Sequence, residues 1–130
     1  MAQQLAQLAL LVIDYDEAIE FYTEKLNFTV AEDTVLSETK RWVLLSPNGS
    51  DDCKLLLAKA ANDEQKSRIG NQTGGRVFLF LYTDDFENDY NIFKQNGVEF
   101  AREVAEEKWG KVAVFKDLYG NLWDLIEKNE

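Results

Sequence analysis

One acidic residue inside an apolar segment is the first candidate for chemistry in this sequence. Asp124 lies in the stretch 121–127, whose apolar residues predict a buried strand. A carboxylate at an inward position of such a strand has to be solvated by a ligand, a metal ion or protein donors. Burial would raise its pKa and suit it to general acid or base catalysis. A structural hydrogen bond, for instance with Gln7 across the sheet, explains Asp124 equally well.

Other residue types that support catalysis are scarce. The chain contains no histidine, which excludes serine triads and most histidine acid-base chemistry. Its one cysteine, Cys53, therefore has no histidine to activate it, and we expect it to be inert. Arg41 and Arg76 each precede an expected strand and could grip a carboxylate or phosphate, although ion pairing at the surface is the simpler explanation.

Length and composition are typical of one soluble globular domain. With 130 residues, 45% of them hydrophobic, the chain can bury a core without a disulfide. Its net charge of −10 would repel phosphate backbones and anionic membranes, and it could either attract a cationic ligand or serve solubility alone. No apolar run approaches the ~20 residues that span a bilayer, and no leader-like start is seen. We therefore expect a cytoplasmic protein that binds neither nucleic acid nor membrane.

The order of apolar and polar stretches predicts two similar halves. Each half has an apolar strand, an acidic helix cap, an amphipathic helix and three further strands. In the first half these are strand 7–13, cap 14–16, helix 17–26 and strands 28–31, 42–45 and 54–58; in the second they are strand 77–82, cap 84–85, a helix from 86 to 96, and strands 98–100, 111–115 and 121–127. Between the halves, Asn62 and Gln65 have capping-box spacing and Gly70 is typical of a helix end, which predicts a short helix in the linker.

The two halves also match residue by residue when the second is shifted back by about 71 positions, a sign of internal repetition. Asp14 then falls on Asp85, and Tyr22 falls on Phe93. Because one open curved sheet cannot bury both of its faces, we expect the halves to pair around a cavity. The predicted fold is α+β, with one domain at 1–130. Two tandem βαβββ modules, at about 5–60 and 75–128 with a linker at about 61–74, would form curved mixed sheets around a central cavity.

Three stretches carry a resemblance to a known family. They are 8–14 leading into Glu20-Phe21-Tyr22, 79–85 leading into 97–100, and 117–125, which reads Asp-Leu-Tyr-Gly-Asn-Leu-Trp-Asp-Leu. In this order and spacing they resemble the vicinal oxygen chelate superfamily, which includes glyoxalases, extradiol dioxygenases and the fosfomycin- and bleomycin-resistance proteins. The third stretch is similar to the Asp-Pro-Asp-Gly-Asn entry to that family's closing strand. The resemblance covers nearly the whole chain.

The resemblance also implies four positions at which family members often hold a divalent metal. They correspond to Gln7, Leu56, Phe78 and Asp124, and two of the four are apolar. A catalytic metal needs about three protein donors, so we expect neither a metal nor another cofactor, with Gln7 and Asp124 the remaining candidates for an unusual divalent site. Glu127 does not add a donor, because strand alternation places it on the opposite face from Asp124.

Aromatic residues on the expected strands could line the cavity. They are Trp42, Phe78, Phe80, Tyr82, Trp109, Phe115 and Trp123. Most should be core, but with Leu56 and Phe78 in place of polar ligands the cavity suits an apolar or cationic ring. The predicted ligand-binding residues are Gln7, Leu56, Phe78, Phe80, Tyr82 and Asp124, and Asp124 is also the candidate catalytic residue.

Three functions remain open. The first is a metal-independent small-molecule-binding protein that resembles the bleomycin-resistance branch. The second is a glyoxalase-like lyase or isomerase, or a dioxygenase, with Gln7 and Asp124 in an unusual metal site. The third is a protein-interaction module whose cavity is vestigial. Because family members commonly pair modules between subunits, the resemblance also implies a homodimer.

Overall fold

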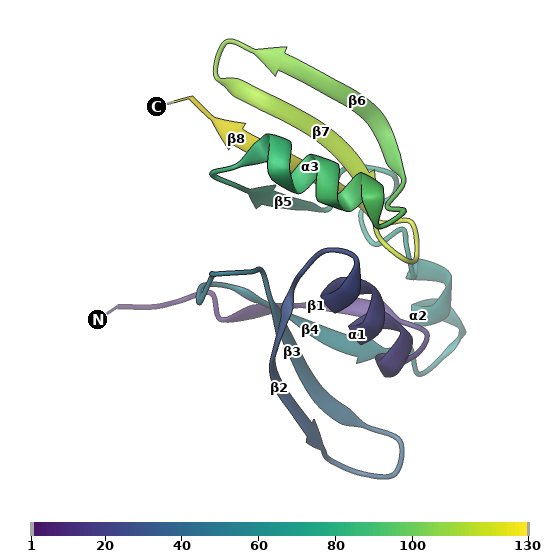
Figure 1. Ribbon diagram of the computed structural model, residues 1–130. Helices are drawn as coiled ribbons and strands as arrows, with labels where there is room; N and C mark the ends of the chain where they lie inside the picture. The colour runs from purple at the N-terminus through teal and green to yellow at the C-terminus, as the bar shows by residue number, and fades with distance from the viewer. Residues whose placement is uncertain (1, 130) are drawn as a thin grey trace. The chain divides into compact units, whose positions relative to one another are not determined.

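The chain forms the predicted α+β fold of two βαβββ modules (Figure 1). A computed structural model describes residues 2–129. Its elements are β1 (Gln7–Val12), α1 (Tyr15–Glu24), β2 (Thr29–Val35), β3 (Arg41–Ser46), β4 (Lys54–Lys59), α2 (Asp63–Arg68), β5 (Leu79–Tyr82), α3 (Phe86–Gln95), β6 (Phe100–Glu107), β7 (Gly110–Lys116) and β8 (Leu122–Lys128). The chain separates into two compact units, called here the N-terminal unit, which ends at Ile69, and the C-terminal unit, which begins at Gly70.

The N-terminal unit contains a four-stranded sheet in the order β1-β4-β3-β2. β1 and β4 run parallel, and the other neighbouring strands are antiparallel. α1 packs on one face of this sheet, where Leu10, Val43 and Leu57 are almost completely buried. Because side chains alternate along a strand, the opposite face carries the intervening residues, such as Leu44 and Leu56.

Side-chain caps determine where the helices of this unit begin. The carboxylate of Asp14 accepts a hydrogen bond from the Glu17 N–H at 3.0 Å, so α1 begins at Tyr15, two residues before the predicted start. At α2, the Asn62 side chain accepts from the Gln65 N–H at 2.9 Å, which confirms the predicted cap. Gln65 reaches back to the N–H of Ala61 at 2.7 Å rather than to that of Asn62.

The C-terminal unit repeats this arrangement in a sheet of order β5-β8-β7-β6, with α3 on one face. Aromatic rings fill the space beneath α3: the ring centroids of Phe93 and Phe115 are 5.3 Å apart, and Trp123 stacks on Phe115 at 5.7 Å. Glu127 also faces this helix, because its carboxylate accepts a hydrogen bond from the Phe86 N–H at 2.7 Å. Glu127 therefore lies on the helix side of β8, as alternation predicts.

β6 is longer and later than predicted, and it forms a hairpin with β7. Six of its eight residues are exposed and four of those are charged, so the sequence lacks the apolar alternation that marks a half-buried strand. Gly110 follows the hairpin turn with φ 154°, and a Cβ there would lie 2.1 Å from the carbonyl oxygen of Glu127. β2 also extends beyond its predicted end; all of its residues are exposed at the edge of the sheet, so its sequence lacks the apolar pattern that predicts a strand.

The turn before β8 is held by a buried carboxylate. Asp117 accepts hydrogen bonds from the N–H groups of Tyr119 and Asn121 at 3.0 and 2.9 Å, and from the side-chain amide of Asn121 at 2.9 Å. This network fixes the entry to the strand that carries Asp124. No helix within residues 2–129 is long and apolar enough to cross a bilayer.

Candidate ligand-binding site

A hollow of about 440 Å³ lies on the sheet of the C-terminal unit. Its lining comes from all four strands of that sheet. Trp123 and Phe115 point toward α3, so the alternate residues Asp124 and Val114, which line the hollow, point to the opposite face. The hollow is therefore built on the face that no helix of this unit covers.

Strand register arranges most of the lining in two rows that cross the sheet from β5 to β6. The first row consists of Phe80, Asp124, Val114 and Arg102. The second row consists of Tyr82, Ile126, Val112 and Ala105. Val114, Val112 and Ile126 thus form an apolar floor in the middle of the hollow. Asp124 lies at the edge of this floor, beside Phe80.

Exposed aromatic side chains surround this floor. Phe80 and Tyr82 are 60% and 58% exposed on β5, although both are large and apolar enough to be expected in a core. Trp109, at the tip of the β6–β7 hairpin, is 47% exposed and also lines the hollow. Two hydrogen bonds from Asn129 hold the hairpin tip in place. Its N–H donates to the Trp109 carbonyl at 2.8 Å, and its side-chain amide donates to the Lys108 carbonyl at 2.7 Å. These rings offer flat surface for a ligand.

Asp124 is electrostatically unusual. Its side chain is half-buried, and it forms no hydrogen bond or ion pair with the described residues of the C-terminal unit. Burial raises the pKa of Asp124 above its ordinary value, and the positive charge of Arg102 lowers that pKa by a smaller amount. The carboxylate therefore lacks the protein donors that a purely structural acid would have in this unit.

An irregularity in β6 brings Arg102 to this face. Phe100 pairs with Phe115 and Arg102 pairs with Val114, so the partner strand advances one residue while β6 advances two. Without this bulge Ala101 would stand opposite Val114, and Arg102 would point toward α3. Arg102 lines the hollow for this reason, and no feature of the sequence marked it.

The structure divides the predicted binding residues between the two units. Phe80, Tyr82 and Asp124 lie together in the hollow. Phe78 donates its N–H to the Leu122 carbonyl at 2.8 Å, just before β5, and does not line the hollow. Gln7 and Leu56 lie on β1 and β4 of the N-terminal unit, on the face opposite α1.

The repeat explains the place of Leu56. Leu56 pairs with Ala9 and Leu44 in the N-terminal sheet, as Asp124 pairs with Phe80 and Val114 in the C-terminal sheet. The two positions are equivalent, and only the second carries a charge.

The donor set does not fit the divalent metal that the family resemblance implies. Leu56 and Phe78 have no side-chain atom that binds a metal ion, and Gln7 and Asp124 supply fewer donors than the about three that fix a catalytic ion. Within residues 2–129, no three side chains of His, Cys, Asp or Glu are grouped as metal ligands.

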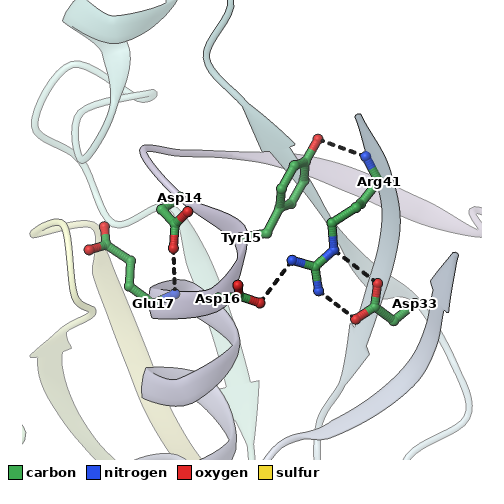
Figure 2. A network of polar contacts seen from close by, with 6 residues as sticks. All are labelled: Asp14, Tyr15, Asp16, Glu17, Asp33 and Arg41. Carbon is green, nitrogen blue, oxygen red and sulfur yellow. Dashed lines mark hydrogen bonds and ion pairs between the residues drawn. The ribbon is translucent and has the colours of Figure 1, made fainter. Parts of the chain in front are cut away.

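Arg41 is part of an ion-pair network in the N-terminal unit (Figure 2). Its guanidinium contacts Asp33 at 2.6 and 3.2 Å and Asp16 at 2.8 Å, and it lies 5.3 Å from the ring centre of Tyr15. Hydrogen bonds from Arg41 to Asp33 and Asp16 raise the pKa of the guanidinium. The expected surface pairing of Arg41 is thus confirmed. Arg76 is exposed ahead of β5 and has no ion pair with other described residues.

Comparison with known proteins agrees with the fold. An uncharacterized protein of Shewanella frigidimarina is 56% identical, with 100% of this chain and 97% of the relative covered. The crystal structure of UcmS2 superimposes with a TM-score of 0.84 at 28% identity, covering 97% of this chain and 98% of UcmS2. TnmS3, described as an antibiotic-binding protein from Streptomyces sp. CB03234, superimposes with a TM-score of 0.78 at 25% identity, covering 99% and 98% of the two chains.

A family model gives the same result over most of the sequence. Residues 4–125 match the Glyoxalase/Bleomycin resistance protein/Dioxygenase superfamily. The match includes both repeats and the strands that carry Phe80 and Asp124. The chain belongs to the glyoxalase/bleomycin resistance protein/dioxygenase superfamily.

Proposed function

We propose that this protein binds a small organic molecule that carries a flat apolar ring and a cationic group, without a metal ion. The hollow of the C-terminal unit would hold this ligand. The observation that carries the proposal is the carboxylate of Asp124, which lies half-buried beside Phe80 with no hydrogen-bond or ion-pair partner in the described part of its unit. A partly desolvated charge is stabilised by an opposite charge, and a ligand cation would supply it.

The apolar lining supports a ring as the rest of the ligand. Ile126 and Val112 form a floor between the exposed rings of Tyr82 and Trp109. The volume of about 440 Å³ lies within the range of roughly 300–1,000 Å³ that is usual for small-molecule pockets. The net charge of −10 raises the local concentration of cations around the protein.

The similarity to TnmS3 also supports a small-molecule ligand. That protein is described as antibiotic-binding, and its chain matches this one over nearly its full length. An organic molecule of similar kind, taken up by binding alone, is consistent with a site that has a charged group and aromatic surfaces but no set of metal donors.

Calorimetric titration with three indole compounds tests the proposal. Tryptamine, a cation, should bind more tightly than neutral 3-ethylindole or anionic indole-3-propionate. Asp124→Asn should weaken tryptamine binding about tenfold, the effect of losing one charge-assisted contact of about 1.4 kcal/mol. The matched control is Asp84→Asn, which removes the same charge from an exposed residue outside the hollow and should leave binding unchanged. Preferential binding of the anion, or equal binding by wild type and Asp124→Asn, would refute the assignment.

A further inference from the structure

We infer that the ligand is zwitterionic, with an ammonium group held by Asp124 and a carboxylate group held by Arg102. This inference rests on the proposed function and adds a second charged group to the ligand. It comes from the position of Arg102 in the same row of side chains as Asp124.

The spacing of the two charges leaves room for a ligand between them. Asp124 is on β8 and Arg102 is on β6, with Val114 of β7 between them. Neighbouring strands are about 4.8 Å apart, so the two backbones are separated by roughly 10 Å. Arg102 influences Asp124 electrostatically, but within residues 2–129 the two side chains form no ion pair. The surface above Val114 is therefore flanked by a negative group on one side and a positive group on the other.

Arg102 has the properties of an available carboxylate receptor. Its side chain is exposed, and it has no ion pair among the described residues, although the chain has 24 acidic and only 14 basic side chains. A guanidinium presents a planar fork of donors that matches a carboxylate with two parallel hydrogen bonds. The bulge of β6 directs this fork toward the hollow instead of toward α3.

A ligand with a single charge could form an ion pair with only one of the two residues, Asp124 or Arg102. A simple cation that approaches Asp124 is attracted by the carboxylate and repelled by Arg102, and a simple anion meets the opposite pair of forces. A zwitterion gains from both contacts. Its apolar ring would extend along the second row, over Val112 and Ile126 toward Trp109.

Three other charged residues line the hollow. Lys128 lies 4.9 Å from the ring centre of Tyr82, and Glu107 lies near the hairpin tip, in the row beyond Val112. Glu103 follows Arg102 in the second irregularity of β6, between the pairs Arg102–Val114 and Ala105–Val112, so the register pairs it with no residue of β7. None of the three is paired within the row of Asp124.

Calorimetry with tryptophan, tryptamine and indole-3-propionate separates the two charges on one ring system. Tryptophan should bind most tightly to the wild-type protein. Arg102→Gln should weaken tryptophan about tenfold and leave tryptamine equal or tighter, whereas Asp124→Asn should weaken both. Lys94→Gln is the matched control: it removes one positive charge from α3, which packs on the other face of the sheet, and should change neither affinity.

The outcomes distinguish this inference from the function on which it rests. If tryptamine binds more tightly than tryptophan, and Arg102→Gln does not weaken tryptophan, the zwitterion inference is overturned while a cation-binding site survives. If indole-3-propionate binds best and depends on Arg102 alone, both are overturned. If none of the three compounds binds at millimolar concentration, the hollow is not a site for ligands of this class, and both are again overturned. Circular dichroism spectra equal to that of wild type would show that each variant is folded.

Discussion

Replacing Asp124 by asparagine should stabilise the protein at neutral pH. Burial raises the pKa of Asp124 in the folded state above its usual value of 3.8. A raised pKa means that the folded state favours the protonated acid, so ionisation above that pKa costs stability. Asparagine has nearly the same shape and never ionises. The advantage of Asp124→Asn should therefore be present at pH 7 and disappear as the pH falls below 3.8, where the wild-type side chain is also neutral.

The environment of Asp124 sets the size of this effect. A fully buried polar group without a partner costs about 1–3 kcal/mol. Asp124 is only half-buried, and Arg102 offsets part of the cost, so we expect a gain of about 1 kcal/mol at pH 7, or about 3 °C in Tm. Urea unfolding followed by tryptophan fluorescence between pH 3 and pH 8 measures the difference. Asp84→Asn, at an exposed position, should show no such gain at pH 7.

A loss of stability in Asp124→Asn at pH 7 would refute this reasoning. It would mean that the ionised carboxylate accepts hydrogen bonds in the folded protein, as the structural explanation of Asp124 requires. A gain that persists unchanged at pH 3 would also contradict it, because the effect would then not come from ionisation.

Other predictions concern the scaffold and its assembly. Gly110→Ala should cost about 3 kcal/mol in urea unfolding, since the new Cβ would lie 2.1 Å from a backbone oxygen; an ordinary loss below 1 kcal/mol would contradict this. Arg41→Lys should cost about 1 kcal/mol in the same assay because it loses the two-point contact with Asp33, whereas the same change at exposed Arg68 should cost nothing measurable. Light scattering should give a mass near twice 15.0 kDa, and a monomer at every accessible concentration would disprove the homodimer. Elemental analysis of the purified protein should find far less than one divalent metal per chain, and one tightly held ion that Asp124→Ala releases would contradict our proposal.

Helix caps and strands with one buried face could be predicted from the sequence, because each is marked by neighbouring residues in the chain. Asp14 and Asp85 both cap helices, and the repeat that relates them is present in the structure. The apolar runs of β1 and β8 were found almost to the residue, because a strand with a buried face has a strong pattern. β2 and most of β6 are exposed, so they lack that pattern, and their pairing is decided by neighbouring strands rather than by their own residues.

Strand periodicity predicts some residues of the hollow and leaves others unmarked. Phe80, Tyr82 and Asp124 follow from alternation on strands that the apolar pattern predicts. Val112 and Val114 could have been found by the same alternation on β7. Arg102 could not, because a bulge shifts the side-chain period and leaves no mark in the composition of β6.

The equivalence of Leu56 and Asp124 has a consequence for stoichiometry. Both sheets present the same backbone frame at these positions, with Ala9 and Leu44 beside one and Phe80 and Val114 beside the other. Two identical repeats would offer two equal sites, but in this chain only the C-terminal repeat carries a titratable side chain at this position. A ligand that depends on that charge should therefore saturate the protein at one molecule per chain.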